Sequence, residues 1–299
     1  MNFLHAGEVA ALGTAVCWTV TMMAFESAGR RVGSLVVNLT RLFIGFAYLS
    51  LFTWVTRGLP FPTDADAHAW FWLTLSGLIG FVIGDLALFR SLLVLGARVA
   101  MLMMSLVPPM TALFGWLVLD ETLHALDWLG MTLTLFGVSL VIFERREDEN
   151  GKRLFSFPIF GILLGIVAAL GQAAGLVFSK FGMGDYNAFA ATQIRLLAGI
   201  VGFSIMFIFI GWWPKVIAGL SDSKALKITA FGAFFGPFMG VSLSLLSVQL
   251  TETGVAATIM SITPVLIIPP AVLIFREKVN ARSIAGAVLA VVGVALLFL

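Results

Sequence analysis

The feature that most constrains this chain is a series of apolar stretches, each about twenty residues long, separated by short interruptions. A helix needs about 20 apolar residues to cross the hydrocarbon core of a bilayer. Of the 299 residues, 60% are hydrophobic and only 11% are charged, whereas a soluble domain carries roughly a quarter charged residues. We therefore predict an all-α integral membrane protein with ten transmembrane helices. We place these helices at 8–27, 34–56, 69–93, 98–119, 126–143, 157–181, 188–211, 225–248, 254–275 and 281–299.

An internal duplication is the second constraint. When the chain is shifted by 156 residues, many glycine, proline and glutamate positions coincide. The matched pairs include Gly80 with Gly236, Gly84 with Gly240, Pro108 with Pro264, Glu121 with Glu277, Gly130 with Gly286 and Gly137 with Gly293. Near the start of each half the offset drifts slightly, and Arg41 meets Arg195. A charged linker at 144–153 lies near the midpoint, so we predict two five-helix repeats, residues 1–150 and 151–299.

The odd number of helices in each repeat has a topological consequence. The second repeat must enter the membrane from the opposite side, so the repeats are inverted, which is typical of secondary transporters. Most Lys and Arg residues gather on the side of the linker, which predicts a cytoplasmic linker and both termini outside. We expect a multi-pass protein of the cell membrane, the bacterial inner membrane, that works as a monomer or a homodimer.

Composition also bears on partners. The net charge is +2, and the basic residues sit in short loops rather than in one patch, which predicts no nucleic-acid partner. Cys17 is the single cysteine, and the three histidines lack the spacing of metal ligands, so we expect no cofactor or metal. The N-terminus lacks the positive region of a signal peptide, so the first apolar stretch is expected to be retained. The expected partners are the lipid bilayer and a small-molecule substrate.

Polar side chains inside the apolar stretches are the candidate substrate-binding and coupling residues, because such groups are costly in a membrane. Trp18 can stack against a substrate, while Glu26 can bind a cation or proton, or else pair with Arg30 at the interface. Asp85 lies about sixteen residues into the third stretch, which suits either a proton-coupling carboxylate or a structural ion pair. Its repeat counterpart is Val241, so the halves differ at this position.

The two matched arginines carry a second set of alternatives. Arg41 and Arg195 lie about two turns into the second stretch of each repeat, and Asn38 precedes Arg41 by three residues. A guanidinium can bind a carboxylate or phosphate through two parallel hydrogen bonds. Alternatively, it can extend along the helix to the membrane interface or form an interhelical ion pair. Gln172 belongs to a wider set of polar groups, some of which must face a cavity and others of which bond across helices.

Glycines, prolines and loop glutamates favour structural roles. Spacings such as Gly80 and Gly84 let helices approach closely. The pair Pro108-Pro109 can bend its helix into a cavity wall or gate, or serve packing alone. Glu121 and Glu277 lie at helix ends, where they can cap the next helix or lock the halves together.

The repeated motif also resembles a known family. Ser105-Leu106-Val107-Pro108 running to Asp120-Glu121, and Ser261-Ile262-Thr263-Pro264 running to Glu277, resemble the EamA family of the drug/metabolite transporter superfamily. Trp18 and Arg41 also fall where that family tends to place Trp and Arg, although Thr19 stands where Gly usually follows the Trp. The resemblance covers essentially the whole chain. It implies transport of small metabolites, often amino acids, or of drugs, and family members usually keep both termini in the cytoplasm.

Secondary transport is the function that these patterns favour. We expect a secondary active transporter, with export as the expected direction, that moves small metabolites such as amino acids, or drug-like compounds, by alternating access. The chain has no Walker A motif, so a proton gradient or simple exchange would drive it. The alternatives are an intramembrane enzyme and a non-transporting structural or receptor protein. The common catalytic motifs that the first would need are missing from the sequence.

Overall fold

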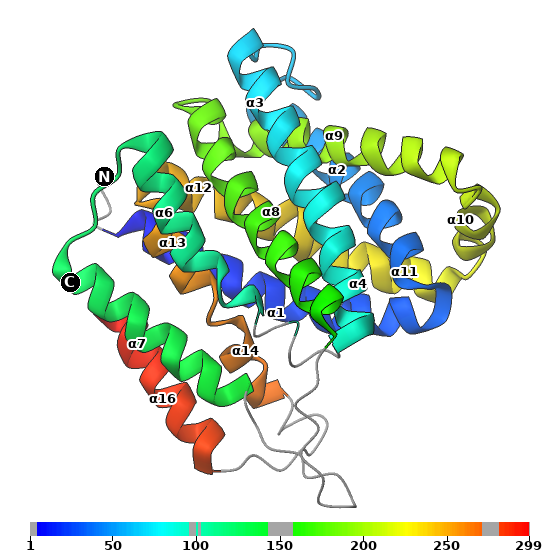
Figure 1. The fold of residues 1–299 in the computed structure, drawn as a ribbon. Coiled ribbons are helices and arrows are strands. Elements are labelled where there is room, and N and C mark those ends of the chain that lie inside the picture. Colours follow the sequence, from blue (N-terminus) through cyan, green and yellow to red (C-terminus); the bar gives the residue numbers. More distant parts are fainter. Residues whose placement is uncertain (1–4, 96–99, 101–102, 143–157, 271–280, 299) are drawn as a thin grey trace, which may run out of the picture.

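The computed structural model describes residues 5–95, 100, 103–142, 158–270 and 281–298, and every regular element within them is helical. The first half contains α1 (Ala6–Val32), α2 (Ser34–Arg57), α3 (Ala67–Gly77), η1 (Leu78–Gly84), α4 (Asp85–Leu95), α6 (Val107–Leu119) and α7 (Ala125–Ile142). The second half contains α8 (Ile159–Met183), α9 (Ala188–Phe209), α10 (Trp213–Leu220), α11 (Ser223–Ala233), η2 (Phe234–Gly240), α12 (Val241–Leu250), α13 (Thr253–Met260), α14 (Thr263–Leu266) and α16 (Ala281–Leu296). Figure 1 shows their arrangement.

The length and hydropathy of these helices confirm a multi-pass membrane protein. Among the described residues, seven helical spans are long and apolar enough to cross a bilayer. Three further apolar helices are shorter, at Val107–Leu119, Ala125–Leu140 and Ile284–Leu296. The first element, α1, begins on the same side of the molecule on which α16 ends, since the rings of His5 and Phe298 lie 5.8 Å apart. We call this the termini side.

A π-helical segment interrupts the third long span of each half. Both η1 and η2 are seven residues long, and Leu78 and Phe234, at which they begin, are 156 residues apart. Segments of π-helix are rare and are frequently found at functional sites. Pro237 lies inside η2, where its missing N–H costs less because the regular α-helical ladder is already broken.

Glycines bring the π segments close to their neighbouring helices, as their spacing predicted. On one side η1 packs against α8, where a Cβ on Gly171 would lie 3.0 Å from the Cα of Gly84. On the other side η2 and α11 pack against α1, where the Thr21 hydroxyl donates a hydrogen bond of 2.6 Å to the Gly232 carbonyl oxygen. Each π segment therefore contacts the first helix of the opposite half.

Equivalent helices of the two halves also pack on each other. The pair α7 and α16 lies side by side at the edge of the molecule (Figure 1). A Cβ on Gly130 would lie 2.9 Å from the Gly293 carbonyl oxygen, and one on Gly137 would lie 2.5 Å from that of Gly286. The residue numbers rise along one helix as they fall along the other, so the two helices are antiparallel.

The second helices of the halves form a further such pair. Among the largest fully buried side chains are Leu39 and Leu42 of α2 and Phe203 and Phe207 of α9. They belong to one apolar cluster in which α2 packs on α9. This cluster and the α7–α16 contact hold the two halves together on either side of the centre.

Two predicted helix boundaries are wrong. The first helix, predicted at 8–27, is longer, because α1 continues to Val32 and ends at Gly33, whose φ of 89° favours glycine. The gap predicted between 211 and 225 instead contains α10, which starts at Trp213. A proline is compatible with the first turn of a helix, since the N–H that it lacks has no helical partner there. Pro214 therefore starts this helix rather than breaking one.

Candidate functional site

A cavity of about 190 Å³ lies between the two halves. Its walls come from α1, α4 and α6 of the first half and from α8, α9, α12, α13 and α14 of the second, among other elements. Apolar side chains dominate the walls, and the polar groups include Gln172, Arg195 and Ser244. We call it the central cavity. A site near the middle of two packed halves is where a transporter of this architecture binds its substrate.

Two helix interruptions form part of the wall. The helical hydrogen bonds break at Ser105-Leu106 just before Pro108, and again at Ser261-Ile262 just before Pro264. Each proline lies in the first turn of a new helix, α6 or α14. The backbone N–H that proline lacks would have no partner within the helix at this position. The prediction of continuous helices at 98–119 and 254–275 is therefore wrong for the described residues. Both interruptions line the central cavity, where irregular backbone is tolerated at membrane depth.

A buried ion pair lies beside the cavity. The Arg41 guanidinium of α2 donates to an Asp85 carboxylate oxygen across 2.5 Å. The other oxygen of Asp85 accepts a hydrogen bond of 3.0 Å from the Gln172 side chain of α8, so three helices converge on this carboxylate. Only 19% of the Arg41 side chain and 11% of the Asp85 side chain are exposed. The geometry thus gives Asp85 the ion-pair partner that one reading of the sequence expected.

The matching arginine of the second half has a different environment. Arg195 of α9 lines the central cavity and is 5% exposed. Its guanidinium lies over the Phe81 ring, 5.1 Å from the ring centre, and its Nε has no hydrogen-bond partner. Among the described residues, no carboxylate forms an ion pair with it. The two halves therefore share the arginine position but not its counter-ion.

The other candidates are divided between the cavity and the surface. Trp18 lines the central cavity together with Met22 of the same helix. Glu26 instead pairs with Arg30 across 2.6 Å, with 66% of its side chain exposed, so the geometry gives no support to a buried cation or proton site there. Asn38 is buried on α2 and does not line the central cavity, and neither polar atom of its side chain has a partner among the described residues.

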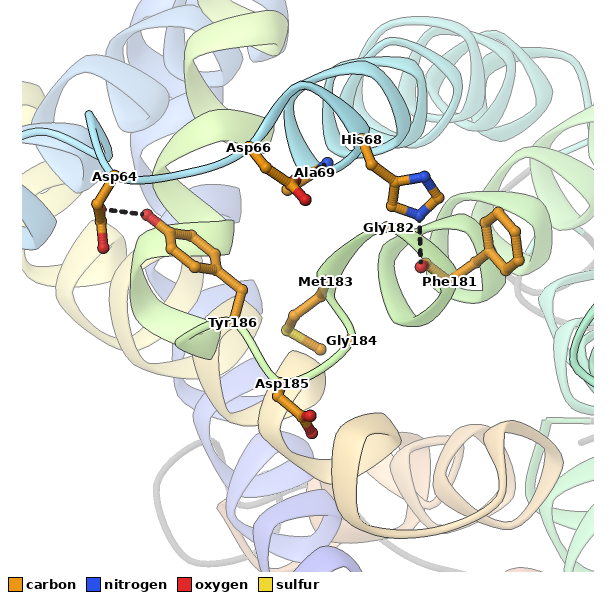
Figure 2. Close-up of a pocket in the computed structure, with 10 residues that line it drawn as sticks. All are labelled: Asp64, Asp66, His68, Ala69, Phe181, Gly182, Met183, Gly184, Asp185 and Tyr186. Carbon is orange, nitrogen blue, oxygen red and sulfur yellow. Dashed lines mark hydrogen bonds between the residues drawn. The ribbon is translucent and has the colours of Figure 1, made fainter.

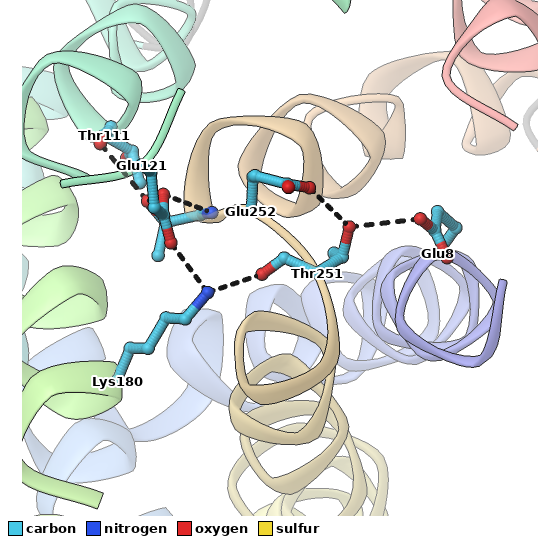
Figure 3. A network of polar contacts seen from close by, with 7 residues as sticks. Glu8, Thr111, Glu121, Lys180, Thr251 and Glu252 are labelled. Atoms are coloured by element: carbon cyan, nitrogen blue, oxygen red, sulfur yellow. Dashed lines mark hydrogen bonds and ion pairs between the residues drawn. The ribbon is translucent and has the colours of Figure 1, made fainter. Parts of the chain in front are cut away.

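A polar network joins the two halves on the termini side (Figure 3). The Glu121 carboxylate, in the segment between α6 and α7, accepts a bond of 2.6 Å from the Lys180 ammonium of α8. It also accepts bonds of 2.9 Å from the Thr253 N–H and 2.6 Å from the Thr253 hydroxyl. Lys180 in turn donates across 2.8 Å to the Thr251 carbonyl oxygen. We call these four residues the termini-side lock.

The termini-side lock joins the halves directly above the central cavity. Glu121 belongs to the first half, and its three partners belong to the second. On the same helices, the cavity residue Leu176 lies four positions before Lys180, and the cavity residue Ala257 lies four positions after Thr253. The lock therefore lies about one helical turn, roughly 6 Å, beyond the cavity. The sequence predicted that Glu121 caps a helix or locks the halves together, but it did not predict Lys180 as its partner.

A second hollow, of about 420 Å³, lies on the termini side between two loops (Figure 2). Its polar groups already bond to one another: Tyr186 donates to Asp64 across 2.8 Å, and Asp66 caps α3 at Ala69. Partial desolvation acts to raise the pKa of Asp64, but hydrogen bonds from Tyr186 and from its own backbone, together with Arg57, lower it overall. These side chains hold the loops in place, and we assign the candidate site to the central cavity.

Comparison with known proteins gives the family. The chain matches the EamA-like transporter family over residues 5–143 and again over residues 159–299. It belongs to this family. The predicted resemblance is confirmed, and the chain is a multi-pass membrane transporter.

Individual relatives share this character. The uncharacterized transporter YdfC of Bacillus subtilis (strain 168) is 26% identical over 224 residues, which cover 71% of this chain and 69% of that protein. The probable amino-acid metabolite efflux pump of Escherichia coli (strain K12) is 25% identical over 188 residues, which cover 61% of each chain. A crystal structure matches with a TM-score of 0.76 over 98% of this chain and 96% of its own, at 18% identity, and so shows the same fold.

Proposed function

We propose that this chain is a secondary active transporter that exports small metabolites by alternating access. In this proposal ten helices form two inverted five-helix repeats, residues 1–150 and 151–299, that rock about the central cavity in the cell membrane of a bacterium. The antiparallel packing of α7 against α16 supports the inversion, because these helices hold the same place in the two halves. The matching π segments and the matching proline-linked interruptions support the duplication.

The termini-side lock is the observation that carries the mechanism. Alternating access requires a barrier that closes one side of the site and can be dissolved without unfolding the halves. A few side-chain bonds to one buried carboxylate meet this need, since their loss leaves the apolar contacts of α2 with α9 intact. The lock is formed in the described conformation, and in this proposal it closes the cavity toward the termini side.

The size of the cavity favours metabolites over large drugs. Pockets for drug-sized ligands measure roughly 300–1,000 Å³, and the central cavity measures about 190 Å³. Export is proposed because the E. coli relative is named as an efflux pump. We place the termini outside from the distribution of Lys and Arg, so the closed side is the outer side.

Cysteine accessibility tests this proposal. In a Cys17→Ser background, Ser244→Cys puts a thiol on the cavity wall, and a membrane-impermeant thiol reagent is applied to either side of sealed vesicles. We expect labelling chiefly from the side opposite the termini. Glu121→Gln, which removes the partner of Lys180, should raise the labelling rate from the termini side several-fold.

Glu252→Gln is the matched control, because Glu252 touches the edge of this network only through the Thr251 hydroxyl, at 3.2 Å. It should leave labelling from both sides unchanged. Equal labelling rates of the thiol at position 244 from both sides would overturn alternating access around this lock. A labelling rate that Glu121→Gln leaves unchanged would overturn it as well.

A further inference from the structure

The charges around the central cavity do not balance. Arg41 and Arg195 hold equivalent places in the two halves, yet Asp85 is the one carboxylate beside them among the described residues. Both oxygens of Asp85 are engaged, one by Arg41 and the other by Gln172. One buried positive charge therefore has no hydrogen-bonded counter-ion. An unpaired charge is expensive to bury, and a buried charge is normally paired or neutralised.

Arg195 is the arginine without a hydrogen-bonded counter-ion, since Asp85 acts on it only through space, and the cavity reaches it. Arg195 is 5% exposed, lines the central cavity and leaves its Nε without an acceptor. Its guanidinium lies over the Phe81 ring, in a cation–π contact that holds the group beside the cavity. The neighbouring Gly80 leaves space, since a Cβ there would lie 3.4 Å from an Arg195 terminal nitrogen. A planar guanidinium of this kind matches a carboxylate, which can accept two parallel hydrogen bonds.

The rest of the cavity suits an apolar body. Its walls carry Trp18, Met22, Leu88, Leu176 and Met260. No carboxylate lines the cavity among the described residues, so a substrate ammonium has no counter-charge there. The volume of about 190 Å³ limits the ligand to a small molecule.

We propose that the central cavity binds small organic acids that have one carboxylate and an apolar body, with Arg195 as the residue that binds the carboxylate. This inference rests on the transporter function proposed above. The bound acid supplies the negative charge that the second half lacks. The acid pairs with Arg195 as Asp85 pairs with Arg41 in the first half.

A set of compounds built on one carbon skeleton tests the charge rule. Leucine carries both charges, 4-methylpentanoate lacks the ammonium, 3-methylbutylamine lacks the carboxylate, and leucinamide carries the ammonium alone. Binding to the purified full-length protein is measured by calorimetry and by thermal shift. We expect 4-methylpentanoate to bind at least as tightly as leucine, and the two compounds without a carboxylate to bind at least tenfold more weakly.

Substitutions at Arg195 assign the residue. Arg195→Gln should weaken binding of 4-methylpentanoate by about tenfold to a hundredfold, the range for a hydrogen bond to a charged group. Arg195→Lys keeps the charge but loses the planar guanidinium, so it should weaken binding of 4-methylpentanoate less than Arg195→Gln does. This variant tests the assignment if Arg195→Gln does not fold. Arg31→Gln, at an exposed arginine paired with Asp222, should leave binding unchanged.

Equal binding of the amine and the acid, or unchanged acid binding in Arg195→Gln, would overturn the inference. Absence of binding by all four compounds would also overturn it for this class of acid. The transporter proposal would survive either result if Glu121→Gln still raised labelling of the thiol at position 244 from the termini side. It would fall if that labelling failed, whichever ligand bound.

Discussion

The Arg41 guanidinium lies 2.5 Å from the Asp85 carboxylate, in a contact that joins α2 to the start of α4 directly after the π segment η1. The corresponding position in the second half, at the start of α12 after η2, is Val241. The duplicated scaffold therefore presents two arginines in equivalent places and provides a carboxylate for one of them.

Neutralising Asp85 should destabilise the protein. In Asp85→Asn the Arg41 charge stays buried without its partner, and breaking a buried pair in this way costs about 3–5 kcal/mol. The melting temperature in detergent should fall clearly, and Arg41→Gln combined with Asp85→Asn should restore part of the loss. Glu26→Gln is the control, because its partner Arg30 is 79% exposed and surface pairs contribute about 0–1 kcal/mol. Equal melting shifts for the two single substitutions would contradict the buried pair.

Asp85 is also the group that we expect to couple transport to protons. A proton on Asp85 would release Arg41 and change the charge balance around the cavity. Uptake into proteoliposomes should therefore respond to an imposed pH gradient, and Asp85→Asn should abolish that response while downhill exchange continues. Flux that is insensitive to pH and unchanged in the Asn variant would remove Asp85 from the coupling role.

The two halves should respond differently to the same small substitution. Gly171 and Gly13 hold corresponding places, 158 residues apart. A Cβ on Gly171 would meet the backbone of Gly84 at 3.0 Å, whereas one on Gly13 would meet only the end of the Leu243 side chain at 3.3 Å. Gly171→Ala should cost about 1–3 kcal/mol through overpacking, while Gly13→Ala should be neutral or slightly stabilising. Thermal unfolding measures both, and equal shifts would argue against the close contact of η1 with α8.

Asp222 should make the start of α11 sensitive to acid. Backbone hydrogen bonds, first from Ala225, and the Arg31 side chain lower the pKa of Asp222 below its ordinary value. A carboxyl group with a lowered pKa in the folded state stabilises above its unfolded pKa, about 3.9, and loses that effect as the pH falls through the folded value. Amide exchange in the first turn of α11 should therefore accelerate below about pH 4 beyond its intrinsic pH dependence.

Two substitutions separate the cap from the charge at this position. Asn caps a helix about as well as Asp but does not titrate, so Asp222→Asn should remove the acid sensitivity and keep the protection. Asp222→Ala should lose protection at every pH. If the Asn variant loosened in acid as much as the native chain, the Asp222 carboxyl group would not be the cause.

The sequence predicted the scaffold better than the site, for a physical reason. Helices and their repetition depend on local hydropathy and on glycine and proline positions, so the matches of Gly80 with Gly236 and of Pro108 with Pro264 pointed to real structural equivalences. The bonds of Asp85 to Arg41 and to Gln172 join residues 44 and 87 positions apart. Which polar groups meet across helices depends on how each helix is rotated, and hydropathy does not encode that.

The same limit explains the termini-side lock and the helix interruptions. Lys180 looks like a charge at the end of an apolar stretch, and only the packing of α8 against the α6–α7 segment brings it to Glu121. Pro108 was expected to bend its helix or to serve packing alone, but it begins a new helix, as its repeat counterpart Pro264 does. A proline motif is compatible with both outcomes, because it removes a donor without fixing where the preceding helix stops.

The matching π segments η1 and η2 also bear on the common origin of the two halves. A π turn is what remains when one residue is inserted into an α-helix without disturbing the helix on either side. Segments of equal length lie at the same register in the two halves, although Pro237 is present in one and Phe81 in the other. One insertion that was copied when the repeat was duplicated is a simpler explanation than two separate insertions at the same position. A single irregular turn that was present before the duplication therefore accounts for both segments.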